Sequence, residues 1–175
     1  MMRRIVVTGL GLVTAVGHNV EDCWSSILAG KSGASSIDSF DTTGFAVTFG
    51  ATVKDFDLSP YMSAKDARKT DTFIHYGIAA AKQALAASGL TIDDSNAERV
   101  GIAIGSGIGG LPGIEKGHAQ YLAGGPRKIS PFFVPSNIIN MIAGNLSIEF
   151  GIKGPNYGIV TACSTAPTTS GMLHG

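Results

Sequence analysis

Short apolar runs alternate along the chain with longer segments whose apolar residues recur at helical spacing. The runs are rich in β-branched residues and predict strands over residues 4–8, 45–53, 99–104 and 157–162. Apolar positions three and four residues apart predict helices over residues 20–29, 71–88 and 114–122, and a fourth helix that Ser136 caps and that ends near Phe150. Strands that alternate with helices favour a layered α/β fold with a mainly parallel sheet.

Polar caps, glycines and prolines mark where these elements end. Asn19 is a good N-cap for the helix over residues 20–29, and Gly30 is a natural stop. Glycine-rich loops are expected at residues 9–17 and 105–110, and an irregular loop with three prolines is expected at residues 124–135.

The composition limits the classes of function. The 175 residues suffice for one domain, and 44% of them are hydrophobic while 15% are charged. Thirteen basic and thirteen acidic residues give a formal net charge of zero, which argues against a nucleic-acid-binding protein. Two cysteines provide neither a disulfide framework nor a zinc site. No apolar run is long enough to span a bilayer and no signal peptide is recognisable, so we expect a cytoplasmic protein.

Residues 158–166 hold the strongest candidate for chemistry. An apolar strand runs into Ala162, Cys163 and Ser164, where a helix should start. Free backbone N–H groups and the positive end of a helix dipole lower the pKa of a thiol in such a place, which makes the thiolate available as a nucleophile. The local pattern leaves a buried structural thiol equally open. Cys23, on a short predicted helix, is best explained as a small buried hydrophobe.

Residues 105–110 satisfy the G-x-G-x-x-G pattern of a dinucleotide site. Pro112 and Gly113 weaken the helix that should follow, and no acidic residue stands about 20 positions further on. Close approach of the backbone to other backbone or to a ligand is therefore favoured over nucleotide binding.

Basic residues and histidines have less specific patterns. Lys65, Arg68 and Lys69 share one helical face, and Arg127 and Lys128 form a second basic pair. These positions are either ordinary solvated charge or a docking patch for an acidic partner. None of the four histidines has metal-ligand spacing or can be assigned as a partner of the cysteine: His18, His75, His118 and His174.

Four separated motifs resemble the β-ketoacyl-[acyl-carrier-protein] synthases, the condensing enzymes of type II fatty acid synthesis. They lie in the family's order at residues 5–11, 105–111, 131–135 and 161–164. The resemblance implies a thiolase-like α/β fold with two similar halves in five-layered α-β-α-β-α packing. Residues 1–166 would then be an incomplete N-terminal synthase domain, holding most of the first half.

The resemblance also implies roles for single residues. Cys163 matches the acyl-accepting nucleophile, whose backbone N–H contributes to the oxyanion hole. Ile108 and Phe133 match residues that line the acyl-chain pocket, and in the family Phe133 reaches in across a dimer interface. The basic positions that dock the acidic acyl carrier protein are matched by Lys65, Arg68, Lys69, Arg127 and Lys128.

The implied reaction is a ping-pong condensation by a homodimer without metal or bound cofactor. An acyl group passes from the phosphopantetheine of the carrier, which enters as part of the substrate, to Cys163. Malonyl-carrier then binds, two histidines assist its decarboxylation, and the carbanion attacks the thioester. Both histidines belong to the family's second half, so we expect this chain alone to be inactive in condensation. The alternative is a non-catalytic fragment that binds the carrier or forms dimers.

Residues 167–175 depart from the family, which has a core helix of the form THNIGHAAR there. One permitted codon choice for residues 166–175 is GCA CCC ACA ACA TCG GGC ATG CTG CAC GGC. When it is translated from the third base of the Ala166 codon, it encodes THNIGHAAR. We therefore infer a one-base loss near this codon and a frameshifted tail, the alternative being an unrelated natural C-terminus.

Overall fold

A computed structural model describes residues 4–172. Its contacts divide the chain into two units. The larger unit contains the described parts of residues 1–6, 61–78 and 90–175, and the smaller unit contains residues 7–60 and 79–89. Within the described residues, no helix is both long and apolar enough to cross a membrane.

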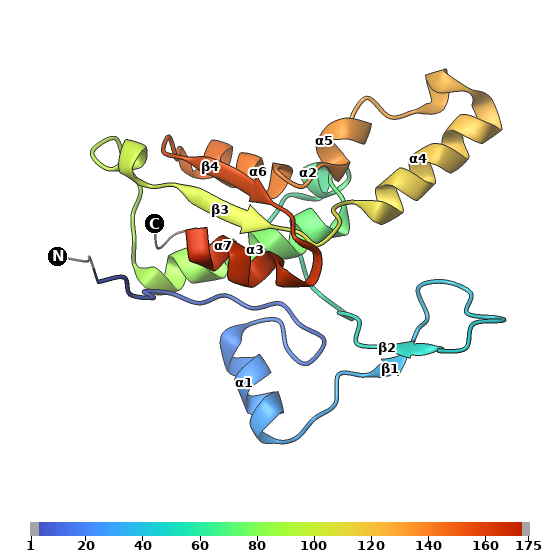
Figure 1. Cartoon of the computed structure of the whole chain (residues 1–175), viewed down its shortest axis with the longest axis horizontal. Coiled ribbons are helices and arrows are strands. Elements are labelled where there is room, and N and C mark those ends of the chain that lie inside the picture. Colours follow the sequence, from blue (N-terminus) through green and yellow to red (C-terminus); the bar gives the residue numbers. More distant parts are fainter. Residues whose placement is uncertain (1–3, 173–175) are drawn as a thin grey trace. The chain divides into compact units, whose positions relative to one another are not determined.

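A two-stranded parallel sheet lies at the centre of the larger unit (Figure 1). Strand β3 (Ile102–Gly105) pairs in parallel with β4 (Asn156–Ile159) over all four residues. The long connection between the two strands carries helices, as parallel pairing requires. The predicted βα alternation and the parallel pairing are therefore confirmed.

Helices cover both faces of this sheet. Helix α6 (Met141–Phe150) lies against one face, where Asn156 Nδ2 donates a hydrogen bond to the Ala143 carbonyl at 3.1 Å. Helix α7 (Thr165–Met172) lies against the other face, where it approaches Gly105 so closely that a Cβ would not fit. The register places Asn156 and Gly105 on opposite faces, because side chains alternate along a strand. The local architecture is thus an α-β-α stack.

Further helices make up most of the rest of the larger unit, together with the first part of α3 (Thr72–Ser88). They are α2 (Ala64–Ala67), η1 (Ala97–Arg99), α4 (Leu111–Gly124), η2 (Pro126–Lys128), α5 (Phe133–Asn137) and η3 (Ala162–Ser164). The buried apolar residues of this unit include Ile74, Ile78, Ile142, Leu146 and Ile159. Gly77 lets α3 approach α6, because a Cβ there would stand 2.7 Å from the Ile142 side chain.

The smaller unit contains α1 (Val20–Leu28), the second part of α3, and a pair of two-residue antiparallel strands, β1 (Ser35–Ser36) and β2 (Phe49–Gly50). As predicted, the Asn19 side chain caps α1 and accepts a hydrogen bond from the backbone N–H of Asp22 at 2.8 Å. The predicted glycine-rich loop also forms: a Cβ at Gly9 or Gly11 would overlap carbonyl oxygens of α3.

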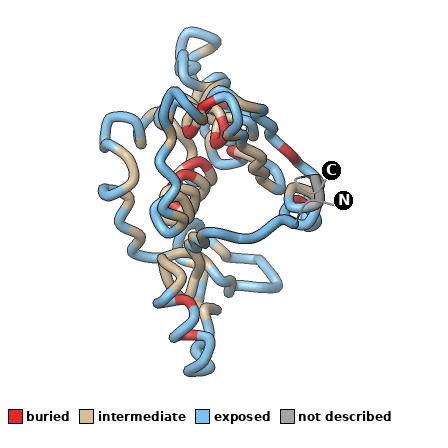
Figure 2. Tube along the Cα trace, turned by 90° about the vertical axis from the view of Figure 1, so that its left-hand side faces the viewer, coloured by how far each residue is buried: buried red, intermediate tan, exposed pale blue. Residues whose placement is uncertain are grey.

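Two of the predicted strands are wrong or much shorter than expected. Residues 4–8 form no strand, and Val7 is 79% exposed. Within the described chain they have no neighbouring strand, and an isolated extended segment leaves its backbone groups to water. The strand predicted over residues 45–53 is reduced to β2. Figure 2 shows how much of the trace is exposed, with buried positions confined to short stretches.

Two predicted helix starts are also wrong. Helix α4 begins at Leu111 rather than at residue 114, because Pro112 stands in the first turn, where a missing N–H costs little. Ser136 lies inside α5 and does not cap α6. Ile138 is extended, with ψ at 141°, and this break delays the start of α6 to Met141.

Candidate functional site

Cys163 lies at a sharp turn between a strand and a helix. Strand β4 ends at Ile159, Cys163 is the central residue of η3, and α7 begins two residues later at Thr165. Cys163 is exposed, so the alternative of a buried structural thiol is wrong. Cys23, by contrast, is 1% exposed and is the buried small residue that was predicted.

Ala162 gives this turn an unusual backbone conformation. Its φ is 50°, in the left-handed region that costs a residue with a Cβ on the order of 1 kcal/mol. Three hydrogen bonds hold the turn closed. Thr161 N donates to Thr165 Oγ1 at 3.0 Å, Thr165 Oγ1 donates to the Ala162 carbonyl at 2.7 Å, and Ser164 N donates to the Thr161 carbonyl at 3.1 Å. Strained backbone of this kind concentrates at functional sites.

A cavity of about 450 Å³ adjoins Cys163 on the α7 face of the sheet. Small residues form most of its lining, which consists of Ala103, Ile104, Gly105, Gly107, Ala162, Cys163, Thr165, Ala166, Thr169 and Ser170. Glycine is needed at position 105, because a Cβ there would stand 2.5 Å from the Ile159 carbonyl oxygen and closer still to the Thr165 side chain. The small lining leaves space beside the thiol for a substrate of modest size.

The glycine-rich loop after β3 packs against neighbouring backbone. Gly109 has a φ of 94°, and a Cβ at Gly110 would stand 2.8 Å from Cα of Asn137. Helix α4 does follow the loop at once, contrary to the expectation from Pro112. The glycines nevertheless serve close backbone approach, which is the favoured alternative of the sequence analysis.

The two residues predicted to line an acyl pocket do not line the cavity at Cys163. Ile108 is 71% exposed. Phe133 lines a second cavity, where its ring occupies the space beside Gly117 of α4. Their predicted roles therefore stay predictions.

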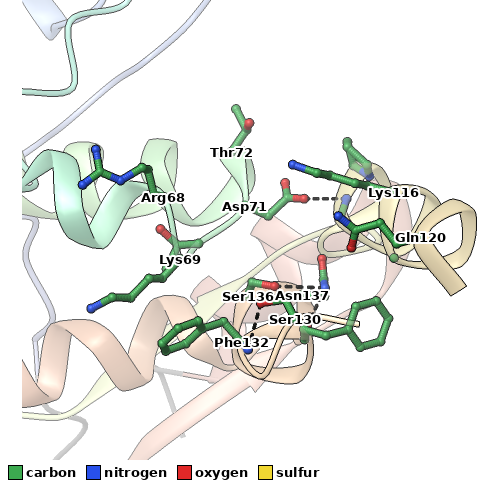
Figure 3. A pocket seen from close by; sticks show the side chains of 15 residues that line it. Arg68, Lys69, Asp71, Thr72, Lys116, Gln120, Ser130, Phe132, Ser136 and Asn137 are labelled. Atoms are coloured by element: carbon green, nitrogen blue, oxygen red, sulfur yellow. Dashed lines mark hydrogen bonds between the residues drawn. The ribbon is translucent and has the colours of Figure 1, made fainter. Parts of the chain in front are cut away.

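The second cavity has a volume of about 460 Å³ and is lined by both polar and apolar side chains (Figure 3). Asp71, at the start of α3, accepts a hydrogen bond from the backbone N–H of Gly113 in the first turn of α4 at 2.8 Å, and its own N–H donates to the Ser136 carbonyl. Lys116 and Gln120 extend from α4 on the same side as Asp71. Sequence reasoning missed all three, and an aspartate at a helix start was the available signal for the first.

The predicted basic positions fall into two groups in the structure. Arg68 and Lys69 line the second cavity, next to Lys65 on α2, and Lys69 Nζ lies 5.5 Å from the centroid of the Phe132 ring. Arg127 and Lys128 form η2 and do not line that cavity. The structure thus gathers three of the five cations around one short helix.

An acidic residue stands among these cations. Lys69 Nζ forms an ion pair with Asp66 Oδ1 at 3.1 Å, and Ser63 Oγ donates to Asp66 Oδ2 at 2.7 Å. The Ser63 hydroxyl, followed by the Lys69 ammonium, lowers the pKa of Asp66 below its ordinary value of 3.8. Lys69 is therefore partly neutralised, whereas no ion pair within the described residues involves Lys65 or Arg68.

No histidine lines the cavity at Cys163 among the described residues. His75 has the structural role that was expected, because its Nε2 lies 3.0 Å from Thr70 Oγ1 and 3.2 Å from the Ala67 carbonyl oxygen. His18 contacts the Phe56 ring edge-on, and His174 lies outside the described residues. Residues 4–172 contain no cluster of side chains that would hold a metal ion.

Comparison with known proteins assigns this chain to a family. Residues 2–173 match the family model described as the N-terminal domain of β-ketoacyl synthases. The chain is 60% identical over 163 residues to 3-oxoacyl-[acyl-carrier-protein] synthase 2 of Vibrio cholerae, covering 93% of this chain and 39% of the relative. The corresponding synthase of Coxiella burnetii is 52% identical over the same length, again with 39% of the relative covered.

Solved structures agree with the sequence comparison. The ishigamide ketosynthase/chain length factor superposes with a TM-score of 0.83 at 27% identity, covering 98% of this chain and 45% of that chain. The chain therefore belongs to the β-ketoacyl synthase family, as the four motifs predicted, and has the α/β fold of the thiolase-like ketosynthases. It spans about 39% of the length of the curated relatives it matches.

Proposed function

We propose that this chain carries the acyl-accepting site of a 3-oxoacyl-carrier-protein synthase, with Cys163 as the nucleophile. The observation that carries the proposal is an exposed cysteine on a strained turn between a strand and a helix, beside a cavity of about 450 Å³. Membership of the synthase family supports it.

In the proposed step the Cys163 thiolate attacks the carbonyl carbon of an acyl thioester carried by phosphopantetheine. A bond forms between the cysteine sulfur and the acyl carbon, and the bond between that carbon and the pantetheine sulfur breaks. The pantetheine thiolate leaves and takes up a proton, so that one thioester replaces another. The backbone N–H of Cys163, in the 3-10 turn before α7, is proposed to stabilise the oxyanion of the tetrahedral intermediate.

We propose that acyl carrier protein delivers the acyl group and docks on the cations around α2. The ammonium of Lys65 and the guanidinium of Arg68 have no ion-pair partner among the described residues, so they remain available to an acidic surface. Arg127 and Lys128 of η2 are proposed to form a second contact with the carrier protein. Because such contacts lie near the surface, salt should weaken them.

We propose that condensation needs residues beyond those described. No described histidine lines the cavity at Cys163, and the family's reaction uses two. The chain alone is therefore proposed to accept an acyl group without condensing it, and no bound cofactor enters the scheme. Homodimer formation and a cytoplasmic location remain proposals that rest on the family resemblance.

A second candidate function is carrier binding without catalysis. It is favoured by one observation: Arg68 and Lys69 line a cavity that shares no lining residue with the cavity at Cys163. Docking and acyl transfer are therefore separable.

Acyl transfer is tested on the chain itself. Incubation with a hexanoyl-loaded carrier protein should add the acyl mass to the peptide containing Cys163, and Cys163→Ser should abolish the modification. Cys23→Ser is the matched control, because that thiol is buried and should not be needed. If the acyl mass appears on Cys23, or if no transfer occurs although the carrier binds, then the second candidate replaces the first.

Docking is tested by titrating holo carrier protein at low and high salt. Reversing Lys65 and Lys69 to glutamate should weaken binding by roughly tenfold or more, since rim charge pairs contribute up to about 1 kcal/mol each. Reversing Lys31 and Lys153 is the matched control, because it changes the net charge equally outside the patch. Equal losses in the two double variants would mean that net charge, and not the patch, determines binding.

A further inference from the structure

The Thr165 side chain is fixed at both of its branches. It is 8% exposed, and its hydroxyl accepts from Thr161 N at 3.0 Å and donates to the Ala162 carbonyl at 2.7 Å. Its methyl group occupies the space that a Cβ at position 105 would fill. Threonine has two common χ1 angles in a helix, because its hydroxyl can bond a carbonyl oxygen of the preceding turn, and the rotamer that bonds the Ala162 carbonyl makes all of these contacts.

The hydroxyl bridges the peptide group before Thr161 and the peptide group after Ala162, the left-handed residue. Ala162 has a φ of 50°, a conformation that is unfavourable without external support. The Thr161 N–H belongs to the peptide that joins Val160 to Thr161, and the Ala162 carbonyl belongs to the peptide whose N–H is that of Cys163. The Thr165 hydroxyl therefore fixes the orientation of the peptide that carries the Cys163 N–H.

We propose that Thr165 is a positioning residue, whose hydroxyl holds the 161–163 turn in its strained form and so aims Cys163 at the cavity. The inference rests on the proposed function of Cys163, but the hydrogen-bond clamp is measurable without any acyl transfer. Valine is the informative substitution, because Thr165→Val keeps both branches and removes only the hydroxyl. Thr165→Ser keeps the hydroxyl and removes the methyl group.

Two readouts test the proposal on the whole chain. The first is residue-resolved hydrogen exchange of the Thr161 amide, compared with the amides of β3 as a measure of folding. The second is the rate at which iodoacetamide alkylates Cys163, relative to the same cysteine in the urea-unfolded chain. Thr168→Val is the matched control, because its hydroxyl lies on the same helix and bonds the Ser164 carbonyl and the Thr161 hydroxyl, but neither of the two peptide groups that the Thr165 hydroxyl bridges.

We expect Thr165→Val to raise the exchange rate of the Thr161 amide about tenfold and to lower the alkylation rate of Cys163 about fivefold, toward that of the unfolded chain. Thr165→Ser and Thr168→Val should stay within about twofold of the parent in both readouts. A Thr165→Val variant that matches the parent in both readouts would overturn the proposal. A Thr165→Ser variant that changes as much as Thr165→Val would also overturn it. So would loss of protection throughout β3 in the valine variant, because the hydroxyl would then hold the sheet and not the turn.

The proposal and the function on which it rests fail in different ways. If the clamp is absent, the Thr161 amide exchanges equally fast in the parent and in Thr165→Val. If the clamp is present but Cys163 is not the acyl acceptor, the amide responds as expected while hexanoyl transfer from the carrier protein is missing.

Discussion

Gly105→Ala should destabilise the larger unit, although alanine is normally more favourable than glycine within a strand. The change adds one methyl group to the face of β3 on which α7 packs. A Cβ at this position would stand 2.5 Å from the backbone oxygen of Ile159, in the paired strand, and closer still to the methyl group of Thr165. Neither neighbour is the free end of a flexible side chain, so the strand pair or α7 must move.

The magnitude follows from two opposing effects. Overpacking a tight contact costs about 1–3 kcal/mol. Replacing glycine in a strand gains roughly 0.5–1 kcal/mol, because the unfolded chain loses conformational freedom. The overpacking wins, and the net loss should be about 1–2 kcal/mol. With a urea m-value of about 2 kcal/mol/M, the midpoint of unfolding should fall by roughly 0.5–1 M.

The assay is urea unfolding followed by far-ultraviolet circular dichroism, with Gly107→Ala as the matched control. Gly107 lies two residues further along, and a Cβ there would meet only the Ala162 carbonyl oxygen at 3.8 Å, an ordinary contact. The control should therefore be neutral or slightly stabilising. A midpoint for Gly105→Ala that equals or exceeds that of Gly107→Ala would refute the close packing of α7 on β3.

Three further outcomes test other parts of the chain. Asn19→Ala should cost α1 about 1 kcal/mol and Asn19→Ser much less, as judged by urea midpoints; equal losses would show that the cap at Asp22 N contributes nothing. The pKa of Asp66 is lowered in the folded chain, so its ionised form stabilises α2 above pH 3.8, and this contribution disappears as the pH falls through the lower, folded-state pKa. Amide exchange of α2 should thus accelerate on acidification in the parent, and Asp66→Asn should remove that dependence on pH. Exposed apolar side chains such as Val7 and Ile148, at 79% and 81%, predict self-association at micromolar concentration, which a monomeric sedimentation profile with a sharp thermal transition would contradict.

Local sequence signals determined the elements whose stability is local. The Asn19 cap, the apolar spacing over residues 71–88 and the small residues after Cys163 predicted helices that the structure contains. The strand before Cys163 was also predictable, because a short β-branched run ends at the point where the next helix starts. Four motifs, each short, were enough to indicate the family, since their order along the chain is specific.

Tertiary structure decided what depends on distant partners. Residues 4–8 have the same apolar pattern as β3, yet only β3 has a paired strand, and pairing is what makes a strand. A linear pattern also does not show which residues surround Cys163: Ile108 and Phe133 do not line its cavity in this chain, and their predicted roles in an acyl pocket stay predictions. The contacts that shape this site, from Thr165 to Ala162 and from α7 to Gly105, depend on backbone angles and on packing across some sixty residues of sequence. A linear pattern records which residues are apolar, but only the folded chain brings a hydroxyl to a strained peptide.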